Sequence, residues 1–164
     1  MQVHLIEAEQ AIDHGPRAAT THPSTLEMLA SLDLLEEFQS LGLVARSFQI
    51  WDRPSMTVVA EFDHDLLKDE TPYPYVVQTE QHKLAELGIR RLQKMSQASV
   101  HMGTRVTDIA QDDAGVRATV RDANSGKTEI IEAEYLVGCD GYGSTVRDLM
   151  GVRMRGRDVL DHSL

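Results

Sequence analysis

The stretch that decides the fold is Tyr135–Arg147, with the sequence YLVGCDGYGSTVR. Its apolar run Tyr135–Cys139 predicts a buried strand. Asp140-Gly141 follows as a glycine-containing turn, and Ser144–Met150 is predicted to be a short helix with a serine cap. In open α/β sheets, ligands bind at the carboxyl ends of strands, where glycines admit a ligand and helix N-termini favour anions. The residues alone leave two interpretations open: a binding site or a purely structural corner.

The segments just before this stretch alternate between apolar and polar residues, as strands do. They cover residues 104–111, 116–122 and 128–132, and the residues between them, Asp112–Gly115 and Asn124–Gly126, are typical of turns. We expect an antiparallel β-meander here.

The first part of the chain predicts a mixture of strands and helices. Val3–Ile6 is predicted to be a buried strand. The sequence HPSTLEMLASLDLLEEFQSLG, residues 22–42, predicts two short helices. Asp33 and Glu36 would form a capping box for the second helix, and Gly42 would be its C-terminal cap.

Residues 46–52 and 56–62 predict two strands joined by a turn. Their aromatic residues, Phe48, Trp51 and Phe62, are expected in the core. Residues 63–74 predict an exposed loop, and residues 80–95 predict a helix with leucines on one face. The chain as a whole is therefore expected to have the α/β fold class.

The composition excludes several kinds of partner and site. Among 164 residues, 26 are acidic and 16 basic, for a net charge of −10. This charge disfavours binding to nucleic acid or to an anionic membrane.

One cysteine, Cys139, excludes an internal disulfide and indicates a reducing compartment, and the first residues do not resemble a signal peptide. We expect a cytoplasmic protein. The seven histidines are scattered and predict no metal site.

YLVGCDGYGSTVRDLMG, residues 135–151, resembles the Asp-Gly motif of the aromatic-ring flavoprotein monooxygenases, the para-hydroxybenzoate hydroxylase-like group. In that family the motif ends a strand and contributes to FAD and NAD(P)H binding. The residues that match it are Asp140, Gly141, Ser144 and Arg147. The resemblance implies a partial FAD/NAD(P)-binding, Rossmann-like domain.

Three shorter matches occur in the order that the family has them. Glu7, at the end of VHLIE, is similar to the acidic residue that binds the adenosine ribose. Arg17 is similar to an arginine near the flavin and pyrophosphate, and Gln81 to a glutamine that begins a helix near the cofactor. Each residue alone would be an ordinary solvated residue, but together the matches extend over nearly the whole chain.

The sequence also departs from the family. The family's GxGxxG turn lies ~20 residues before the ribose carboxylate, whereas six residues precede Glu7. The second flavin motif, Gly-Asp-Ala-Ala-His, is not found either. We therefore expect an internal fragment: residues 1–151 as an incomplete FAD-binding domain and residues 152–164 as the start of a truncated substrate domain. Weak or no FAD binding is expected from this polypeptide alone.

The resemblance implies FAD- and NAD(P)H-dependent hydroxylation of a small aromatic, phenolic substrate, and no residue is identified as a catalytic base. An alternative is a non-catalytic remnant or a subunit that self-associates or needs a completing polypeptide to bind FAD. A related flavoenzyme, such as a halogenase or a reductase, is a third possibility. A GxGxxG motif in frame upstream of the coding sequence and a Gly-Asp motif downstream would favour the hydroxylase.

Overall fold

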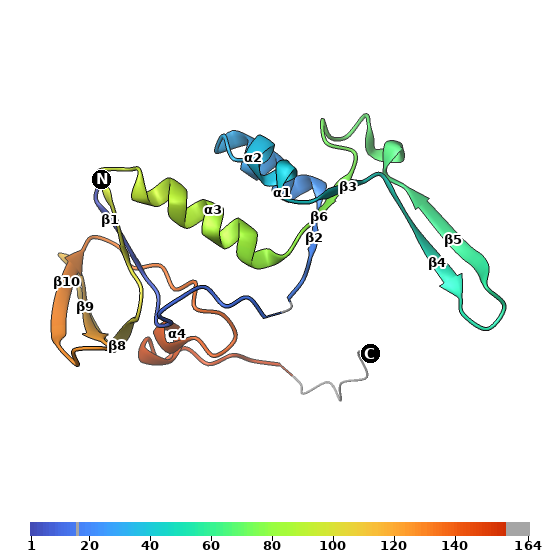
Figure 1. Cartoon of the computed structure of the whole chain (residues 1–164). Helices are drawn as coiled ribbons and strands as arrows, with labels where there is room; N and C mark the ends of the chain where they lie inside the picture. Colours follow the sequence, from blue (N-terminus) through green and yellow to red (C-terminus); the bar gives the residue numbers. More distant parts are fainter. Residues whose placement is uncertain (16, 157–164) are drawn as a thin grey trace. The chain divides into compact units, whose positions relative to one another are not determined.

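A computed structural model describes residues 1–15 and 17–156 and confirms the α/β fold class (Figure 1). The chain forms two compact units. Unit 1 combines residues 1–11 with the chain from Gln97 onward, and unit 2 is the continuous segment Ile12–Ser96. In the described part of the chain, no helix is long and apolar enough to cross a membrane.

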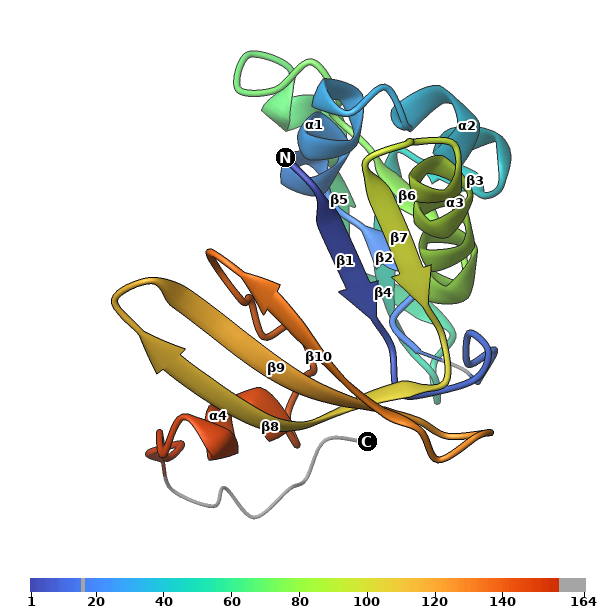
Figure 2. The same ribbon diagram turned by 90° about the vertical axis from the view of Figure 1, so that its left-hand side faces the viewer.

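Unit 1 contains two small sheets. Strand β1 (Val3–Ile6) pairs in parallel with β7 (Ala98–His101), with Val3 opposite Ala98 and Ile6 opposite His101. The predicted meander is confirmed as β8 (Thr104–Asp112), β9 (Gly115–Asp122) and β10 (Thr128–Ala133), in the antiparallel order β10-β9-β8 (Figure 2). Helix α4 (Thr145–Leu149) follows the meander. Strand β7 was not predicted, because its four residues, ASVH, are too few to show a distinctive period.

The centre of the meander follows the two-residue period of a strand. Val116, Ala118 and Val120 on β9 are buried, whereas Arg117 between them is exposed. Alternate side chains point to opposite faces of a sheet, so one face of β9 is covered and the other meets solvent.

For two segments that the sequence predicts to be buried strands, the predicted burial is wrong. Val3 and Leu5 of β1 are 39% and 37% exposed, and β1 pairs only with β7 in the described part of the chain. Tyr135–Cys139 is not a strand: it pairs with no described strand, and Tyr135 and Val137 are 83% and 80% exposed. An apolar run becomes a buried strand only where another strand completes its hydrogen bonds and another layer covers it.

Unit 2 has a helical core beside a small sheet. Helices α1 (Pro23–Ser31), α2 (Leu35–Ser40) and α3 (Gln81–Gln93) confirm the three predicted helices. The sheet has the order β2-β6-β3, from β2 (Thr20–Thr21), β6 (Val76–Gln78) and β3 (Leu43–Ala45). The side chains of one buried cluster join these elements, and they are Leu26, Leu29, Leu35, Phe38, Val77 and Leu87.

The predicted caps of α2 are wrong. Leu34 is the N-terminal cap and makes no side-chain bond, whereas Asp33 lies in the left-handed region at φ 55°. Leu41 is the C-terminal cap. Gly42 is required for another reason: a Cβ there would lie 2.7 Å from the Gln78 carbonyl oxygen.

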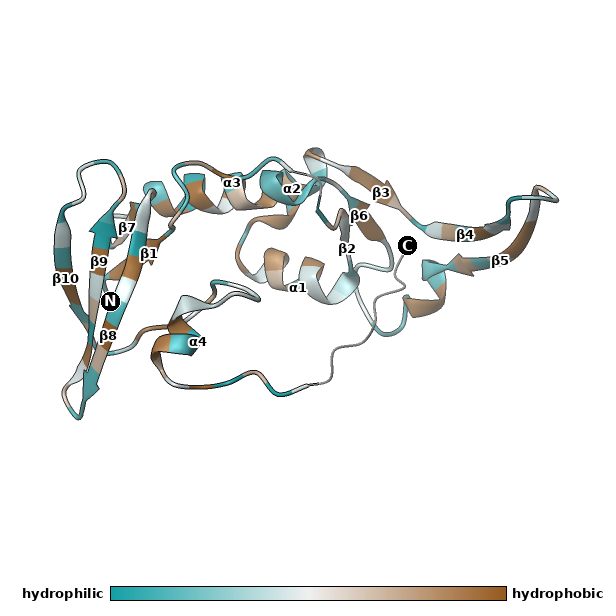
Figure 3. Ribbon diagram, turned by 90° about the horizontal axis from the view of Figure 1, so that it is seen from below, coloured by the Kyte–Doolittle hydropathy of each residue, from teal (hydrophilic) through white to brown (hydrophobic). Residues whose placement is uncertain are grey.

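The predicted hairpin is confirmed as β4 (Ser47–Asp52) and β5 (Thr57–Asp63), but its side chains are not a core. Phe48, Trp51 and Phe62 are 51%, 52% and 46% exposed, and hydrophobic residues recur along both strands (Figure 3). The rings of Phe48 and Phe62 stack with centroids 4.6 Å apart. The aromatic pair therefore stabilises the hairpin locally.

The loop predicted after the hairpin is partly wrong. It begins with a 3-10 helix, η1 (His64–Leu67). Thr71, which follows this helix in the predicted loop, is buried, and its hydroxyl donates to Glu27 Oε1 at 2.5 Å. One polar anchor therefore ties this segment to α1.

We predict opposite effects for two glycine-to-alanine substitutions in unit 2. Gly42→Ala forces the backbone away from Gln78 and lowers the free energy of unfolding by about 1–3 kcal/mol. Gly88→Ala raises it by about 0.5–1 kcal/mol, because Gly88 lies inside α3 and a Cβ there meets nothing within 4 Å. Urea unfolding followed by circular dichroism measures both. Equal effects of the two variants would contradict the close approach at Gly42.

Candidate functional site

The Asp-Gly corner of unit 1 is held by the side chains of Asp140 and Ser144. Ser144 Oγ donates to Asp140 Oδ1 at 2.5 Å, and the Val146 amide donates to Asp140 Oδ2 at 3.0 Å. Ser144 is also the N-terminal cap of α4, because its Oγ accepts from the Arg147 amide at 3.0 Å. Both carboxylate oxygens of Asp140 thus bind the start of the helix, which fixes the turn.

These bonds change the acidity of Asp140. The hydrogen bond from Ser144, followed by that from the Val146 amide, holds the pKa of the Asp140 carboxyl below its ordinary value of 3.8. Donors that bind the charged form stabilise it. Asp140 is therefore an ionised hydrogen-bond acceptor at neutral pH.

The glycines of the corner have different roles. Gly141 has a φ of 77°, which favours glycine, and a Cβ there would meet nothing within 4 Å. Gly138 is packed: a Cβ there would lie 2.9 Å from Val146 Cβ. Gly138 therefore lets the chain pass close to α4, whereas the space beside Gly141 is open to a ligand.

Arg147 is bound within the same corner. Its Nη1 donates to the Tyr142 carbonyl oxygen at 2.8 Å, and its Nη2 lies 3.2 Å from Asp148 Oδ1. The guanidinium is thus partly occupied by the turn.

Glu7 lies directly after the carboxyl end of β1, as the sequence predicts. Its amide donates to the His101 carbonyl oxygen at 2.9 Å, and its carbonyl oxygen accepts from the Thr104 amide at 2.8 Å. Its side chain is exposed, and Oε1 accepts from the Glu9 amide at 2.8 Å. The backbone is therefore fixed by the β7–β8 connection, while the carboxylate retains acceptor sites for a ligand.

Arg17 belongs to a polar loop of unit 2. Its Nη2 donates to Asp13 Oδ2 at 2.8 Å, and Asp13 Oδ1 accepts from the Gly15 amide at 2.8 Å. The bond from Arg17 is the main cause of a lowered pKa of the Asp13 carboxyl. The Arg17 side chain is 60% exposed, and its guanidinium would have to share or exchange this partner to bind a phosphate.

Gln81 begins α3, as the sequence predicts, and its exposed side chain faces a small pocket in unit 2. The pocket has a volume of about 210 Å³ and is lined mostly by residues from β2 and from α1 and α3, among them Thr20, Thr21, His22, Thr25, Gln81 and Leu84. Pockets for drug-sized ligands have volumes of about 300–1,000 Å³. This pocket is therefore large enough for only a part of a drug-sized ligand.

The structure divides the predicted site residues into two groups. Glu7, Asp140, Gly141, Ser144 and Arg147 are in unit 1, whereas Arg17 and Gln81 are in unit 2. Cys139, expected to be packed, is exposed.

The sequence analysis missed a contact in unit 2. His14 Nε2 lies 3.1 Å from Glu86 Oε1, and the His14 ring stacks on His82. The sequence does not predict this contact between a histidine in a loop and a carboxylate on a helix. His82 and Glu86 are four residues apart on a predicted helix, so their side chains share one face of it. This spacing was the signal in the sequence that could have indicated the cluster.

Comparisons with known proteins point to one family. A family model described as "FAD binding domain" matches residues 1–163. Para-nitrophenol 4-monooxygenase of a Pseudomonas species is 27% identical over 156 residues, which cover 95% of this chain and 38% of that protein. The 12-dehydrotetracycline 5-monooxygenase/anhydrotetracycline 6-monooxygenase of Streptomyces rimosus is 34% identical over 142 residues, covering 87% of this chain and 26% of that protein. The chain thus spans less than two fifths of these two relatives.

Solved structures have the same fold. The p-nitrophenol 4-monooxygenase PnpA of Pseudomonas putida matches with a TM-score of 0.88 at 24% identity, over 95% of this chain and 39% of that one. The OxyS anhydrotetracycline hydroxylase of Streptomyces rimosus matches with a TM-score of 0.81 at 29% identity, over 96% and 30%.

The bonds of Asp140 predict a pH effect. The unfolded state binds its proton more tightly than the folded state, so the network stabilises the fold above the ordinary pKa of aspartate. That stability is lost as the pH falls through the lower folded-state pKa. We expect NMR titration of the Asp140 carboxyl to give a midpoint below 3.8, and Ser144→Ala to raise that midpoint towards 3.8.

Substitutions test the same network through stability. Asp140→Asn removes the negative charge and replaces one of the two accepting oxygens with an NH2 group. We expect it to lower the free energy of unfolding of unit 1 by only about 1 kcal/mol, because the side chain is largely exposed to solvent. Asp148→Asn is the control: it makes the same change of charge but removes only an exposed ion pair with Arg147. A loss of stability from Asp148→Asn as large as that from Asp140→Asn would argue against the network.

Proposed function

This chain belongs to the FAD-binding domain family, and from this membership we propose that it is part of a flavoprotein monooxygenase that hydroxylates an aromatic, phenolic substrate. The match of the family model to residues 1–163 is the observation that carries the proposal. The names of the relatives support it further, since they describe monooxygenases of para-nitrophenol and of 12-dehydrotetracycline and anhydrotetracycline.

The residues of the chain fit an FAD in several places. In unit 1, the exposed Glu7 carboxylate follows a parallel strand and suits the hydroxyls of a ribose. Beside Gly141 there is room for a ligand to approach the backbone. Asp140 supplies acceptor sites next to it. These groups are proposed to contact the cofactor directly.

Ser144 and Arg147 are proposed to act on the cofactor through the shape of the corner. The Ser144 side chain is buried, donates to Asp140 and accepts from the Arg147 amide. The Arg147 side chain holds the Tyr142 carbonyl. Both residues thus position Asp140 and the turn.

In unit 2, Arg17 and Gln81 are proposed to bind polar parts of FAD. The Arg17 guanidinium matches a phosphate in geometry and charge, once it shares or leaves Asp13. The Gln81 amide offers a donor and an acceptor at the edge of the pocket.

Bound FAD would supply the redox chemistry, in which NAD(P)H is the reductant and one oxygen atom of O₂ enters the ring while the other leaves as water. The residues named above bind and orient the cofactor. None of them is assigned a proton-transfer role with the substrate.

The domain boundaries and the cellular setting also belong to the proposal. Residues 1–151 would be the FAD-binding part, and residues 152–164 would lead into a substrate domain; of these, residues 157–164 lie outside the described chain. A single cysteine supports a cytoplasmic location.

We predict that the 164-residue polypeptide binds added FAD weakly and saturably, and that Glu7→Gln weakens this binding roughly tenfold because a charged acceptor is lost. Quenching of flavin fluorescence during titration with protein measures the affinity. Glu9→Gln is the matched control, because it makes the same chemical change two residues along, where the carboxylate has no proposed role. Unchanged affinity in Glu7→Gln would remove Glu7 from the site, and no saturable quenching by the unsubstituted polypeptide would contradict the proposed FAD binding.

A further inference from the structure

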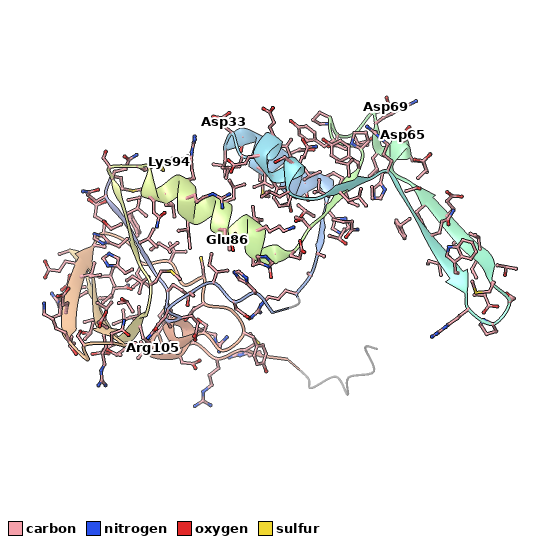
Figure 4. All side chains as sticks on the ribbon, viewed as in Figure 1. Asp33, Asp65, Asp69, Glu86, Lys94 and Arg105 are labelled. Carbon is pink, nitrogen blue, oxygen red and sulfur yellow. The ribbon has the colours of Figure 1, made fainter. Side chains whose placement is uncertain are left out.

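Three side chains of unit 2 form a cluster that the proposed FAD site does not use. His82 and Glu86 lie one turn apart on the same face of α3, and His14 comes from the loop before β2. Figure 4 shows Glu86 on α3. The ligand atoms of the three residues, one each, all lie within 4.8 Å of one another. A loop and a helix thus bring two imidazoles and one carboxylate together.

The contacts within the cluster orient these groups towards each other. His14 Nε2 lies 3.1 Å from Glu86 Oε1. The rings of His14 and His82 are stacked, with centroids 4.3 Å apart and an angle of 15° between their planes. His82 and Glu86 are half-buried, whereas the side chain of His14 is 64% exposed. The helix therefore supplies two partly shielded groups and the loop supplies a third that can adjust.

The charges around the cluster leave one side of the carboxylate available. Arg90 Nη1 is 4.0 Å from Glu86 Oε2, but the closer partner of Arg90 is Glu37, at 3.1 Å. Asp13 precedes His14 and is bonded to Arg17. Oε1 of Glu86, which faces His14, is thus the oxygen that a cation would find.

We propose that His14, His82 and Glu86 form a binding site for a divalent transition-metal ion of the zinc type. Imidazole nitrogens suit zinc, copper and nickel, whereas magnesium and calcium prefer sites made of oxygen ligands. Two histidines and one carboxylate are a known protein ligand set for zinc, in which water takes the remaining position. Solvent reaches this cluster through the exposed His14.

Binding requires a small contraction of the cluster. Zinc lies about 2.0–2.2 Å from its nitrogen and oxygen ligands, so atoms up to 4.8 Å apart must approach each other. Rotation of the exposed His14 side chain provides this movement, since His82 and Glu86 are already one turn apart on a formed helix.

The ion would connect two segments that carry proposed cofactor residues. His14 is three residues before Arg17, and His82 directly follows Gln81. A metal bound to His14 and α3 would hold this loop against the helix. Since the ion binds the folded form, it would stabilise unit 2 by an amount that rises with the logarithm of its concentration above the Kd.

The test is a zinc titration of the whole 164-residue polypeptide, without an affinity tag, at neutral pH and without flavin. Isothermal titration calorimetry is expected to show one site, and cobalt added in place of zinc is expected to give the visible absorption of a protein-bound ion. Zinc is also expected to raise the midpoint of thermal unfolding. His82→Ala and Glu86→Gln should each weaken binding by at least about tenfold.

His101→Ala is the matched control. His101 also stacks on another histidine, His4, with its Nε2 3.0 Å from His4 Nδ1, but this pair belongs to no three-residue ligand group in the described chain. The site is supported if His101→Ala retains the affinity that His82→Ala and Glu86→Gln lose while circular dichroism shows both folded. Equal affinity in the unsubstituted chain and in Glu86→Gln would overturn it. So would an equal loss in His101→Ala.

Discussion

The parallel pairing of β1 with β7 is the interaction on which unit 1 depends. It joins residues 3–6 to residues 98–101, and its hydrogen bonds continue beyond the strands, where Glu7 binds the backbone of His101 and Thr104. Glu7 is thereby fixed at the carboxyl end of a strand, the place where α/β folds bind ligands. The short sequence VHLI forms a strand because it pairs with β7. This pairing fixes the position of β1, and therefore also that of Glu7 at its end.

The Asp-Gly corner shows a conflict between stability and binding. Asp140 uses both carboxylate oxygens to hold the corner, accepting from Ser144 and from Val146. Arg147 and Arg17 are likewise engaged, with Tyr142 and Asp13. Polar residues of such a site keep their geometry through partners of this kind, and a ligand that takes one partner's place must compensate for the bond it breaks.

The sequence predicted what depends on local pattern and missed what depends on neighbours. The meander, the hairpin, the three main helices and the Ser144 cap all follow from periodicity and turn residues, and the structure confirms them. The burial of Tyr135–Cys139 and of Phe48 was wrong, because burial needs a second layer that no local pattern reveals. The close approach of Gly42 to Gln78 could not be predicted, because the two residues are far apart in sequence. The sequence therefore indicated only a helix cap at Gly42. The cluster at Glu86 was missed for the same reason, since His14 lies far from α3 along the chain.

The division of unit 1 into two segments has a consequence for synthesis on the ribosome. His4 and His101 are separated by 97 residues, and the whole of unit 2 is made between them. At about 5–20 residues per second, β1 waits roughly 5–20 s for β7. During that interval unit 2, which is continuous and has its own core, can fold, while Val3 and Leu5 still lack the pairing that β7 provides. Unit 2 thus has the time to form its core before unit 1 can assemble from its two segments.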